Sequence, residues 1–357
     1  MQTTKNQIDH FFEVLVEQDG SDLHLSEGQP PKIRKHGDIS AIREEPLTRM
    51  ELDMLLQEIC KPAWWDKFVK TGDLDFAYEM DEDSRFRCNY HKHFNGYGAI
   101  FRLIPNRIKT LQELNLPPRI QSFGDLTSGL VLVTGPTGSG KSTTLAAIID
   151  YINKTYAKHI VTIEEPIEFV HQNHKSVITQ REVPNDAQSF LQGLKAALRE
   201  DADVILVGEL RDLETISLAL TASETGVLVF ATLHTNNARK TVDRIIDAFP
   251  ADEQELVRTM LSTSLRGVVA QLLMRRKDKN GRLAVNEIMV ANNAVASIIR
   301  EGQTVKLIDT IKTGRKEGMQ LMDDAIDNFH KQGLISGQEA YMKSIDKHRF
   351  EHLIGQG

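Results

Sequence analysis

The chain has few cysteines and no long apolar run, and both absences limit what it can be. Only Cys60 and Cys88 are present among 357 residues, and no Cys-x-x-Cys pair occurs. This pattern argues against a disulfide framework and against a structural zinc site. No apolar stretch reaches the ~20 residues that a helix needs to cross a bilayer. We therefore expect a soluble, cytoplasmic protein.

Basic residues do not outnumber acidic ones in this chain. The chain has 43 Lys and Arg against 50 Asp and Glu, a net charge of -7, so we do not expect nucleic acid as a partner. Its 40% apolar and 26% charged residues are ordinary for a globular protein with substantial cores. A length of 357 residues exceeds one typical domain, so two domains are expected.

The most informative motif spans residues 135–142 and reads Gly-x-x-x-x-Gly-Lys-Ser. It lies between the apolar residues 130–133 and a helix-like segment, which is the strand–loop–helix context of a P-loop. Glycines let backbone N–H groups turn toward phosphates, and the helix N-terminus adds partial positive charge. This context disfavours the alternative, a glycine-rich turn before a helix. We expect Lys141 to reach the β- and γ-phosphates of a nucleoside triphosphate and Ser142 to hold Mg²⁺. The residues expected to contact the nucleotide are Gly135, Pro136, Thr137, Gly138, Ser139, Gly140, Lys141, Ser142 and Thr143.

Polar residues follow three further apolar segments. Glu164 and Glu165 end the segment that starts at residue 160, Glu209 ends the one that starts at 204, and His234 ends the one that starts at 228. Open parallel sheets bind ligands at the carboxyl ends of their strands. We expect Glu209 to hold Mg²⁺ directly or through water, and His234 to sense the γ-phosphate; a carboxylate free of the metal can orient the attacking water. One such residue could be merely solvated, but three beside a P-loop favour a functional site.

Alternating apolar and amphipathic segments indicate the architecture. Expected buried strands are residues 130–133, 159–163, 204–207 and 227–233, with helices between them, which implies a mainly parallel α/β sheet. After about residue 290 the chain reads as helical, with Gly333 as a helix C-cap and Ser336 to Glu339 as a capping box. The predicted organisation is an N-terminal α+β domain (1–105), a linker (106–118), the α/β core (119–290) and a C-terminal helical part (291–357).

Asn95-Gly96 predicts a two-residue β-hairpin turn in the N-terminal part. With that turn, Asn89 pairs with Arg102, and Arg87 and Arg102 become diagonal neighbours about 7–8 Å apart. The arginines could supply positive charge to a γ-phosphate, or they could be an exposed polar face. The hairpin's expected core face consists of Phe86, Cys88, Tyr90, Phe94, Tyr97, Phe101 and Leu103.

Two histidine pairs stand apart from these motifs. They are His91 with His93 and His171 with His174. Neither pair has an acid or a thiol at a spacing typical of metal ligands, so we interpret them as surface histidines.

Taken together, the motifs resemble those of secretion-type motor ATPases. Residues 135–142, 162–168, 206–212 and 231–235 are similar to the Walker A, Asp box, Walker B and His box of that superfamily. Residues 20–25, 114–117 and 299–302 resemble its PilT-type branch, the retraction ATPases of type IV pili, and the similarity covers nearly the whole chain.

The resemblance implies a PAS-like N-terminal domain, a RecA-like ATPase domain and a homo-hexameric ring. It implies ATP and Mg²⁺ as ligands, with Glu164 as general base and Glu209 as Walker B acid. Arg87 and Arg102 would close on the phosphates, within one chain or across a subunit boundary. The implied partners are an inner-membrane pilus platform protein and a paralogous retraction ATPase, with the motor at the cytoplasmic base of the pilus.

Two positions depart from the family pattern. Glu165 stands where the Asp box usually has Asp, and Ile298 stands where an Ala-Ile-Arg-Glu motif usually has its Ala. The four-cysteine insert typical of assembly and type II secretion relatives is missing, which favours retraction over assembly. Two alternatives stay open: a related secretion or assembly motor, and a nucleotide-gated structural subunit that does not hydrolyse ATP.

Overall fold

The computed structural model describes residues 6–35, 38–81, 84–105, 107–278 and 281–354. By its internal contacts the chain divides into two compact units, Met1–Arg107 and Ile108–Gly357. Asn106, the first residue of the predicted linker, lies outside the described residues. The other predicted domain boundaries, at residues 118 and 290, stay predictions.

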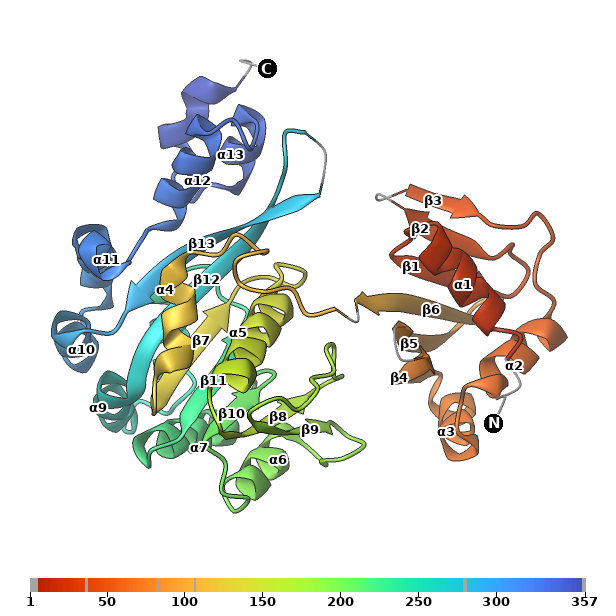
Figure 1. The fold of residues 1–357 in the computed structure, drawn as a ribbon, viewed down its shortest axis with the longest axis horizontal. Helices are drawn as coiled ribbons and strands as arrows, with labels where there is room; N and C mark the ends of the chain where they lie inside the picture. Colours follow the sequence, from red (N-terminus) through yellow and green to blue (C-terminus); the bar gives the residue numbers. More distant parts are fainter. Residues whose placement is uncertain (1–5, 36–37, 82–83, 106, 279–280, 355–357) are drawn as a thin grey trace. The chain divides into compact units, whose positions relative to one another are not determined.

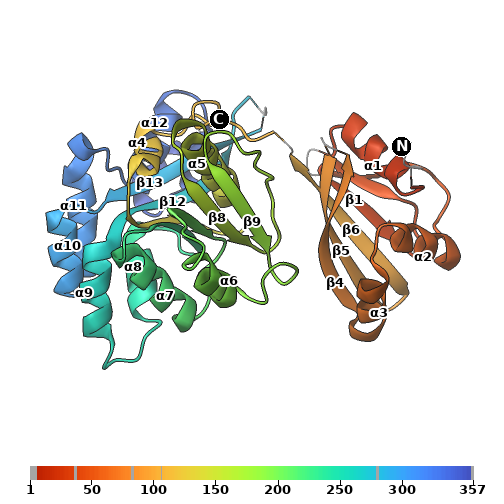
Figure 2. The same cartoon turned by 60° about the horizontal axis from the view of Figure 1, so that its bottom comes forward.

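The N-terminal unit is a six-stranded antiparallel sheet with helices on one face (Figure 2). Its strand order is β3-β2-β1-β6-β5-β4. The strands are β1 (Asp22–Ser26), β2 (Lys32–Lys35), β3 (Asp38–Ala41), β4 (Asp73–Asp81), β5 (Ser84–His93) and β6 (Gly96–Pro105). The helices are α1 (Asp9–Glu17), α2 (Arg49–Glu58) and α3 (Pro62–Thr71). Phe11, Phe12 and Leu15 lie on one face of α1 and are buried, and they join one core with the inward face of the sheet.

The predicted register of the β5–β6 hairpin is wrong by two residues. Asn89 pairs with Ile100, and Arg87 lies directly opposite Arg102 rather than diagonal to it. The last pair is His93 with Gly96, so Phe94 lies beyond the paired strands and is fully exposed instead of buried. A shift of two residues keeps every paired side chain on its own face, so the apolar alternation could not detect it.

A tertiary contact accompanies the observed register. A Cβ at position 96 would overlap the carboxylate of Glu27, which also accepts from Tyr97 N and from Arg49 Nη1, the latter at 3.1 Å. Gly96 also has φ 133°, a backbone angle that favours glycine, so it fits the first position of β6 beside Glu27.

The larger unit is built on a seven-stranded sheet in the order β13-β12-β7-β11-β10-β8-β9. Strands β7, β11, β10, β8 and β9 run parallel, as does β12 beside β7, whereas β13 is antiparallel. The bounds are β7 (Gly129–Thr134), β8 (His159–Glu164), β9 (Val177–Glu182), β10 (Val204–Val207), β11 (Leu228–Leu233), β12 (Leu265–Arg275) and β13 (Arg282–Val290). The predicted α/β class and its four buried strands are confirmed.

Helices cover both faces of this sheet (Figure 1). One face carries α4 (Pro118–Ser122) and α5 (Lys141–Thr155), and the other carries α6 (Phe190–Ala197), α7 (Leu213–Glu224) and α9 (Gln254–Ser264). Helix α8 (Ala238–Ile246) packs against β12 and β13. The short helix η1 (Phe123–Asp125) packs against α5. The apolar side chains of the two layers and the sheet form one continuous core.

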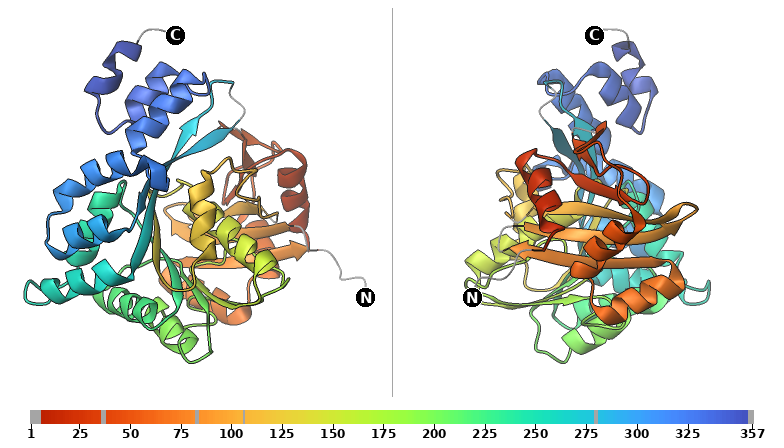
Figure 3. Two further views of the ribbon diagram at one scale, coloured as in Figure 1. Left: turned by 60° about the vertical axis from the view of Figure 1, so that its left-hand side comes forward. Right: turned by 90° about the vertical axis from the view of Figure 1, so that its right-hand side faces the viewer.

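The C-terminal segment is helical, as expected. It comprises α10 (Asn293–Arg300), η2 (Thr304–Lys306), α11 (Leu307–Thr313), η3 (Gly314–Glu317), α12 (Met322–Lys331), α13 (Gly337–Lys343) and η4 (His348–Leu353). Helices α12 and α13 and η4 form a separate small core with β12 and β13 (Figure 3). Gly333 has φ 72° after α12, and Ser336 caps α13 by accepting from Glu339 N at 3.1 Å. Within the described ranges, we find no helix with the length and apolar character needed to cross a membrane.

Candidate nucleotide-binding site

The P-loop connects β7 to α5 through glycines in conformations that other residues rarely adopt. Gly135, Gly138 and Gly140 have φ of 147°, 75° and 84°. A Cβ on Gly135 would overlap the carbonyl oxygen of Gln271. The motif therefore wraps tightly against β12. Gly135 is required for space, and all three glycines have backbone angles that favour glycine.

Gln271 of β12 holds the P-loop through a hydrogen bond to its backbone. The sequence analysis did not identify this residue. Its Nε2 donates to the carbonyl oxygen of Ser139 at 2.7 Å. Its Oε1 accepts from Thr144 Oγ1 at 2.8 Å and from Asn286 Nδ2 at 3.0 Å. Gln271 is 1% exposed, so this side chain is a buried hydrogen-bonded support for the phosphate loop. Ser139 and Gln271 are far apart in the chain, and no local motif signals the contact.

Lys141, the P-loop lysine, lies against its own loop. Its Nζ donates to the carbonyl oxygens of Gly135 at 2.9 Å and Pro136 at 3.3 Å. Burial lowers the pKa of Lys141, and the nearby carboxylates of Glu209 and Glu168 act in the opposite direction. An ammonium group that is partly removed from water gains more from an anionic ligand than an exposed one does.

The acids and the histidine predicted from strand ends lie at one edge of the sheet. Glu164 ends β8, while Glu209 follows β10 and His234 follows β11. These strands are neighbours, and β11 also pairs with β7, which leads into the P-loop. Oε1 of Glu209 lies 3.2 Å from Nε2 of His234. The structure thus places Glu164, Glu209 and His234 at the same edge of the sheet, and their roles stay predictions.

Arg211 connects two of the acids and was not singled out from the sequence. Its Nε lies 2.9 Å from Glu209 Oε2, and its Nη1 donates to Glu165 Oε2 at 2.8 Å. The Glu165 position, where the family usually has Asp, is therefore occupied by an acid that holds this arginine. Arg211 follows Glu209 by two residues, but the sequence alone could not show which way its side chain points.

Glu164 lies in an environment that changes its acidity. Thr162 Oγ1 donates to its Oε1 at 2.7 Å, and Gln180 Nε2 donates to the same oxygen at 3.4 Å. Burial nevertheless raises the pKa of Glu164 to about 7, against an ordinary value of 4.5. A carboxyl with a pKa near neutrality is suited to accept a proton from water.

The interpretation of His171 as a surface residue is wrong. His171 is half-buried and lines a small cavity of about 30 Å³ together with Ser142, Glu164 and Thr232, and burial lowers its pKa to about 4. His171 belongs to the loop between β8 and β9. Its backbone N–H donates to Gln180 Oε1 at 2.7 Å, which holds this part of the loop against β9. The other histidine of that pair, His174, is exposed, as expected.

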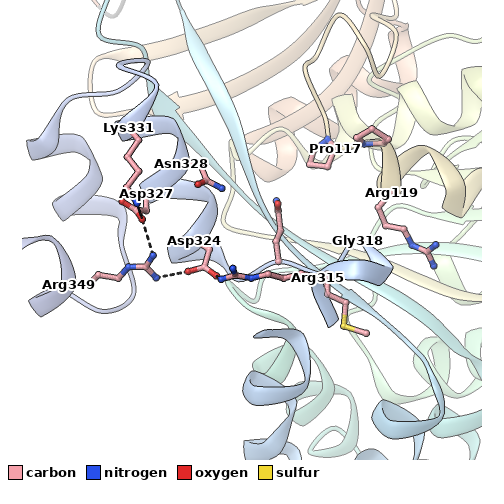
Figure 4. A pocket seen from close by; sticks show the side chains of 12 residues that line it. Pro117, Arg119, Arg315, Gly318, Asp324, Asp327, Asn328, Lys331 and Arg349 are labelled. Atoms are coloured by element: carbon pink, nitrogen blue, oxygen red, sulfur yellow. Dashed lines mark hydrogen bonds and ion pairs between the residues drawn. The ribbon is translucent and has the colours of Figure 1, made fainter. Parts of the chain in front are cut away.

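A second, larger cavity of about 630 Å³ lies away from these strand ends (Figure 4). It is lined by α4, η3, α12 and η4. Its two acids are already neutralised: Asp324 pairs with Arg315 and Arg349, both at 2.7 Å, and Asp327 pairs with Lys331 at 2.8 Å. These pairs lower the pKa of both carboxyls and join the C-terminal helices to each other and to η3. We assign this cavity no part in phosphate binding.

The two predicted arginines belong to the N-terminal unit. Arg102 Nε lies 2.8 Å from Asp22 Oδ1, and Arg87 Nε lies 3.6 Å from Asp75 Oδ1. The side chain of Arg102 is 67% exposed, so the pair with Asp22 leaves most of the guanidinium accessible. Their participation in a nucleotide site stays a prediction.

The residues at the sheet edge fit a metal–nucleotide complex. The cradle consists of left-handed glycines, and Ser139 Oγ is buried there without a hydrogen-bond partner among the described residues. A hydroxyl from Ser142 and a carboxylate from Glu209 are hard oxygen donors of the kind that Mg²⁺ binds. Fold and site together define a P-loop nucleotide-binding protein.

Comparisons with known proteins place the chain more narrowly. The family model described as "Type II/IV secretion system protein" matches residues 85–342. The chain is 48% identical to "Type IV pilus retractation ATPase PilT" of Pseudomonas aeruginosa over 92% of this chain and 95% of the relative. It is 49% identical to "Twitching motility protein" of Neisseria gonorrhoeae over 87% of this chain and 83% of the relative.

A solved structure agrees with these matches. The crystal structure of "the Pilus Retraction Motor PilT and Bound ADP" superposes with a TM-score of 0.90 at 39% identity, covering 98% of this chain and all of that one. The chain belongs to the type II/IV secretion system protein family, in its pilus retraction branch.

Proposed function

We propose that this chain is an ATP-hydrolysing motor subunit that powers the retraction of type IV pili. One observation carries the proposal: a P-loop and the side chains of Glu164, Glu209 and His234 lie at the carboxyl ends of neighbouring parallel strands. That arrangement can cradle a triphosphate, hold its metal and activate water at one place. Relatives named for pilus retraction and twitching motility, matched over nearly the whole chain, specify the process.

Each residue has a distinct part in the proposed reaction. The N–H groups of the P-loop and the ammonium of Lys141 hold the phosphates of ATP. Glu164, with its raised pKa, takes the proton of the attacking water. Ser142 and Glu209 hold Mg²⁺, which supplies charge neutralisation on the phosphate oxygens when bound. His234 contacts Glu209 and would report the loss of the γ-phosphate to it.

The proposal extends to assembly and partners. The chain forms a homo-hexameric ring in which Arg87 and Arg102 complete the site by offsetting charge on the transferred phosphoryl group. A hydrolysis cycle that moves the N-terminal unit against the P-loop unit would act on an inner-membrane platform protein from the cytoplasmic side. A paralogous retraction ATPase is a further partner.

An ATPase assay coupled to mass measurement tests the enzyme and the ring together. We expect Mg²⁺-dependent ATP hydrolysis by a particle of six chains, and loss of hydrolysis in Lys141→Ala. Equal rates in the wild type and Lys141→Ala would refute the enzyme and leave the non-hydrolysing structural subunit.

A genetic test separates retraction from assembly. Deletion of the gene should leave surface pili in place and abolish twitching if the chain drives retraction. Loss of pili on deletion would favour the related assembly motor instead.

A further inference from the structure

Thr162 is a buried polar residue with an unusual partner. It lies on β8, between β10 and β9, and is 0% exposed. Its hydroxyl donates at 2.7 Å to Oε1 of Glu164, two residues further along the same face of the strand. Apolar residues fill most of this strand interior, and a valine would occupy the same volume as threonine.

Gln180 reaches the same oxygen from the neighbouring strand. Thr162 and Gln180 are register partners in the parallel β8–β9 ladder. Gln180 Oε1 accepts from His171 N at 2.7 Å, and its Nε2 donates to the carbonyl oxygen of Phe169 at 2.8 Å. These two backbone contacts fix the orientation of the carboxamide, so that its N–H₂ and not its oxygen faces Glu164 at 3.4 Å.

From this geometry, and resting on the proposed role of Glu164 as base, we infer that Thr162 and Gln180 are positioning residues for hydrolysis. They hold the Glu164 carboxylate by its Oε1. Oε2 has no side-chain donor among the described residues, and proton transfer from water goes to this oxygen. The oxygen that accepts two side-chain donors is the less basic one, because its lone pairs are engaged.

The arrangement gives the base a defined rotamer before substrate binds. Glu164 has rotatable side-chain bonds, and a general base must keep its accepting oxygen within hydrogen-bond reach of the water. Because Thr162 and Glu164 lie on the same strand, the backbone of β8 keeps the Thr162 hydroxyl close to the carboxylate. The pKa of about 7 for Glu164 reflects burial as the largest cause, which raises it. The two side-chain donors and the backbone N–H of Glu168 all act in the opposite direction and favour the charged form.

Thr162→Val removes the donor and keeps the shape. We expect kcat for ATP hydrolysis to fall about tenfold, because a hydrogen bond to a charged group contributes on this scale. The affinity for a non-hydrolysable ATP analogue should stay at the wild-type value, since the Thr162 hydroxyl donates to Glu164 and not to the P-loop. Thr162→Ser, which restores the hydroxyl, should recover kcat.

A matched control is Thr215→Val. Thr215 is also 0% exposed, and its hydroxyl donates to the Asp212 carboxylate at 2.9 Å at the start of α7. This variant loses the same type of hydrogen bond and should keep its kcat. Wild-type kcat in Thr162→Val, or an equal loss of kcat in both variants, would overturn the inference.

A double-mutant cycle with Glu164→Gln decides whether Thr162 acts through the base. Measured in single-turnover experiments, Thr162→Val should have no further effect in the Glu164→Gln background. A full additional loss there would mean that Thr162 acts independently of Glu164 and would overturn the inference. A wild-type rate in Glu164→Gln alone would instead remove the proposed base, so the two failures are distinguishable.

Gln180→Glu keeps the inference testable if Thr162→Val does not fold. It retains an acceptor for the N–H of His171 and replaces the donor to Glu164 by a carboxylate. We expect a lower kcat with unchanged affinity for the ATP analogue, and wild-type kcat would contradict the role of Gln180.

Discussion

Oε1 of Glu209 lies 3.2 Å from Nε2 of His234, although the two residues follow different strands of the sheet. The contact is possible because β10 and β11 are adjacent and in register, with Val207 opposite Ala231. It joins the acid proposed to hold the metal to the histidine proposed to sense the γ-phosphate. Any nucleotide-dependent shift of one side chain therefore changes the surroundings of the other.

Lys141→Ala should weaken nucleotide binding. The ammonium is the cation of the P-loop, and its loss removes charge-assisted hydrogen bonds to phosphate, so we expect affinity to fall by about tenfold or more. Titration calorimetry with ADP and with an ATP analogue measures this effect. Unchanged affinity, in a variant whose thermal unfolding matches the wild type, would contradict the placement of the triphosphate.

Glu164→Gln should bind ATP and hydrolyse it very slowly. The amide is close in shape to the carboxylate but cannot accept the proton of water, and general-base catalysis contributes roughly 10²–10⁴-fold. Binding affinity and single-turnover rates, measured on the same preparation, separate the two properties. Normal turnover would remove Glu164 as the base.

The raised pKa of Glu164 predicts a particular pH profile. The base works only when deprotonated, so kcat/KM should rise with pH and level off above about 7, the pKa to which burial raises this carboxyl. The folded state also holds this proton more tightly than the unfolded chain does. The protonated carboxyl therefore contributes stability below its ordinary pKa of 4.5, and this contribution is lost as pH rises through about 7. An acid limb near the ordinary pKa would show that burial has no effect on the base.

Arg102→Ala should impair hydrolysis more than ring assembly. Arg102 keeps most of its guanidinium accessible while Asp22 orients it, which suits a residue that approaches phosphates only during turnover. ATPase rate and particle mass are the two readouts, and Lys92→Ala, an exposed cation near the end of β5, is the control. Wild-type activity in Arg102→Ala would reduce the arginine to a surface residue.

Gln271→Ala should remove the hydrogen bond that holds the P-loop to β12. It leaves the Thr144 hydroxyl and the Asn286 amide without their shared acceptor and releases the carbonyl oxygen of Ser139. Unsatisfied buried polar groups cost about 1–3 kcal/mol each, so we expect lower stability in denaturant unfolding and weaker nucleotide binding. Unaltered nucleotide affinity in a destabilised variant would restrict Gln271 to a structural role.

The sequence predicted the strand-end site because that site depends on local order. A P-loop, and an acid or histidine after each buried strand, are placed at one edge by the parallel sheet itself. Glu164, Glu209 and His234 could be identified without coordinates for this reason.

Features that depend on distant contacts could not be predicted in this way. Gln271 on β12 supports Ser139 of the P-loop, and the alternation of side chains leaves open the hairpin register in which Gly96 lies beside Glu27. The position of His171 depends on how its loop folds over α5 and β8, so its burial was also missed.

A crystal structure of Glu164→Gln with ATP and Mg²⁺ tests the central claim most directly. The account predicts the triphosphate in the loop of residues 135–142, with Lys141 moved from the Gly135 carbonyl to the phosphates. Ser142 and Glu209 should lie beside the metal, and residue 164 should face the γ-phosphate. An empty loop, or nucleotide bound with Glu209 and residue 164 turned away from it, would contradict the account.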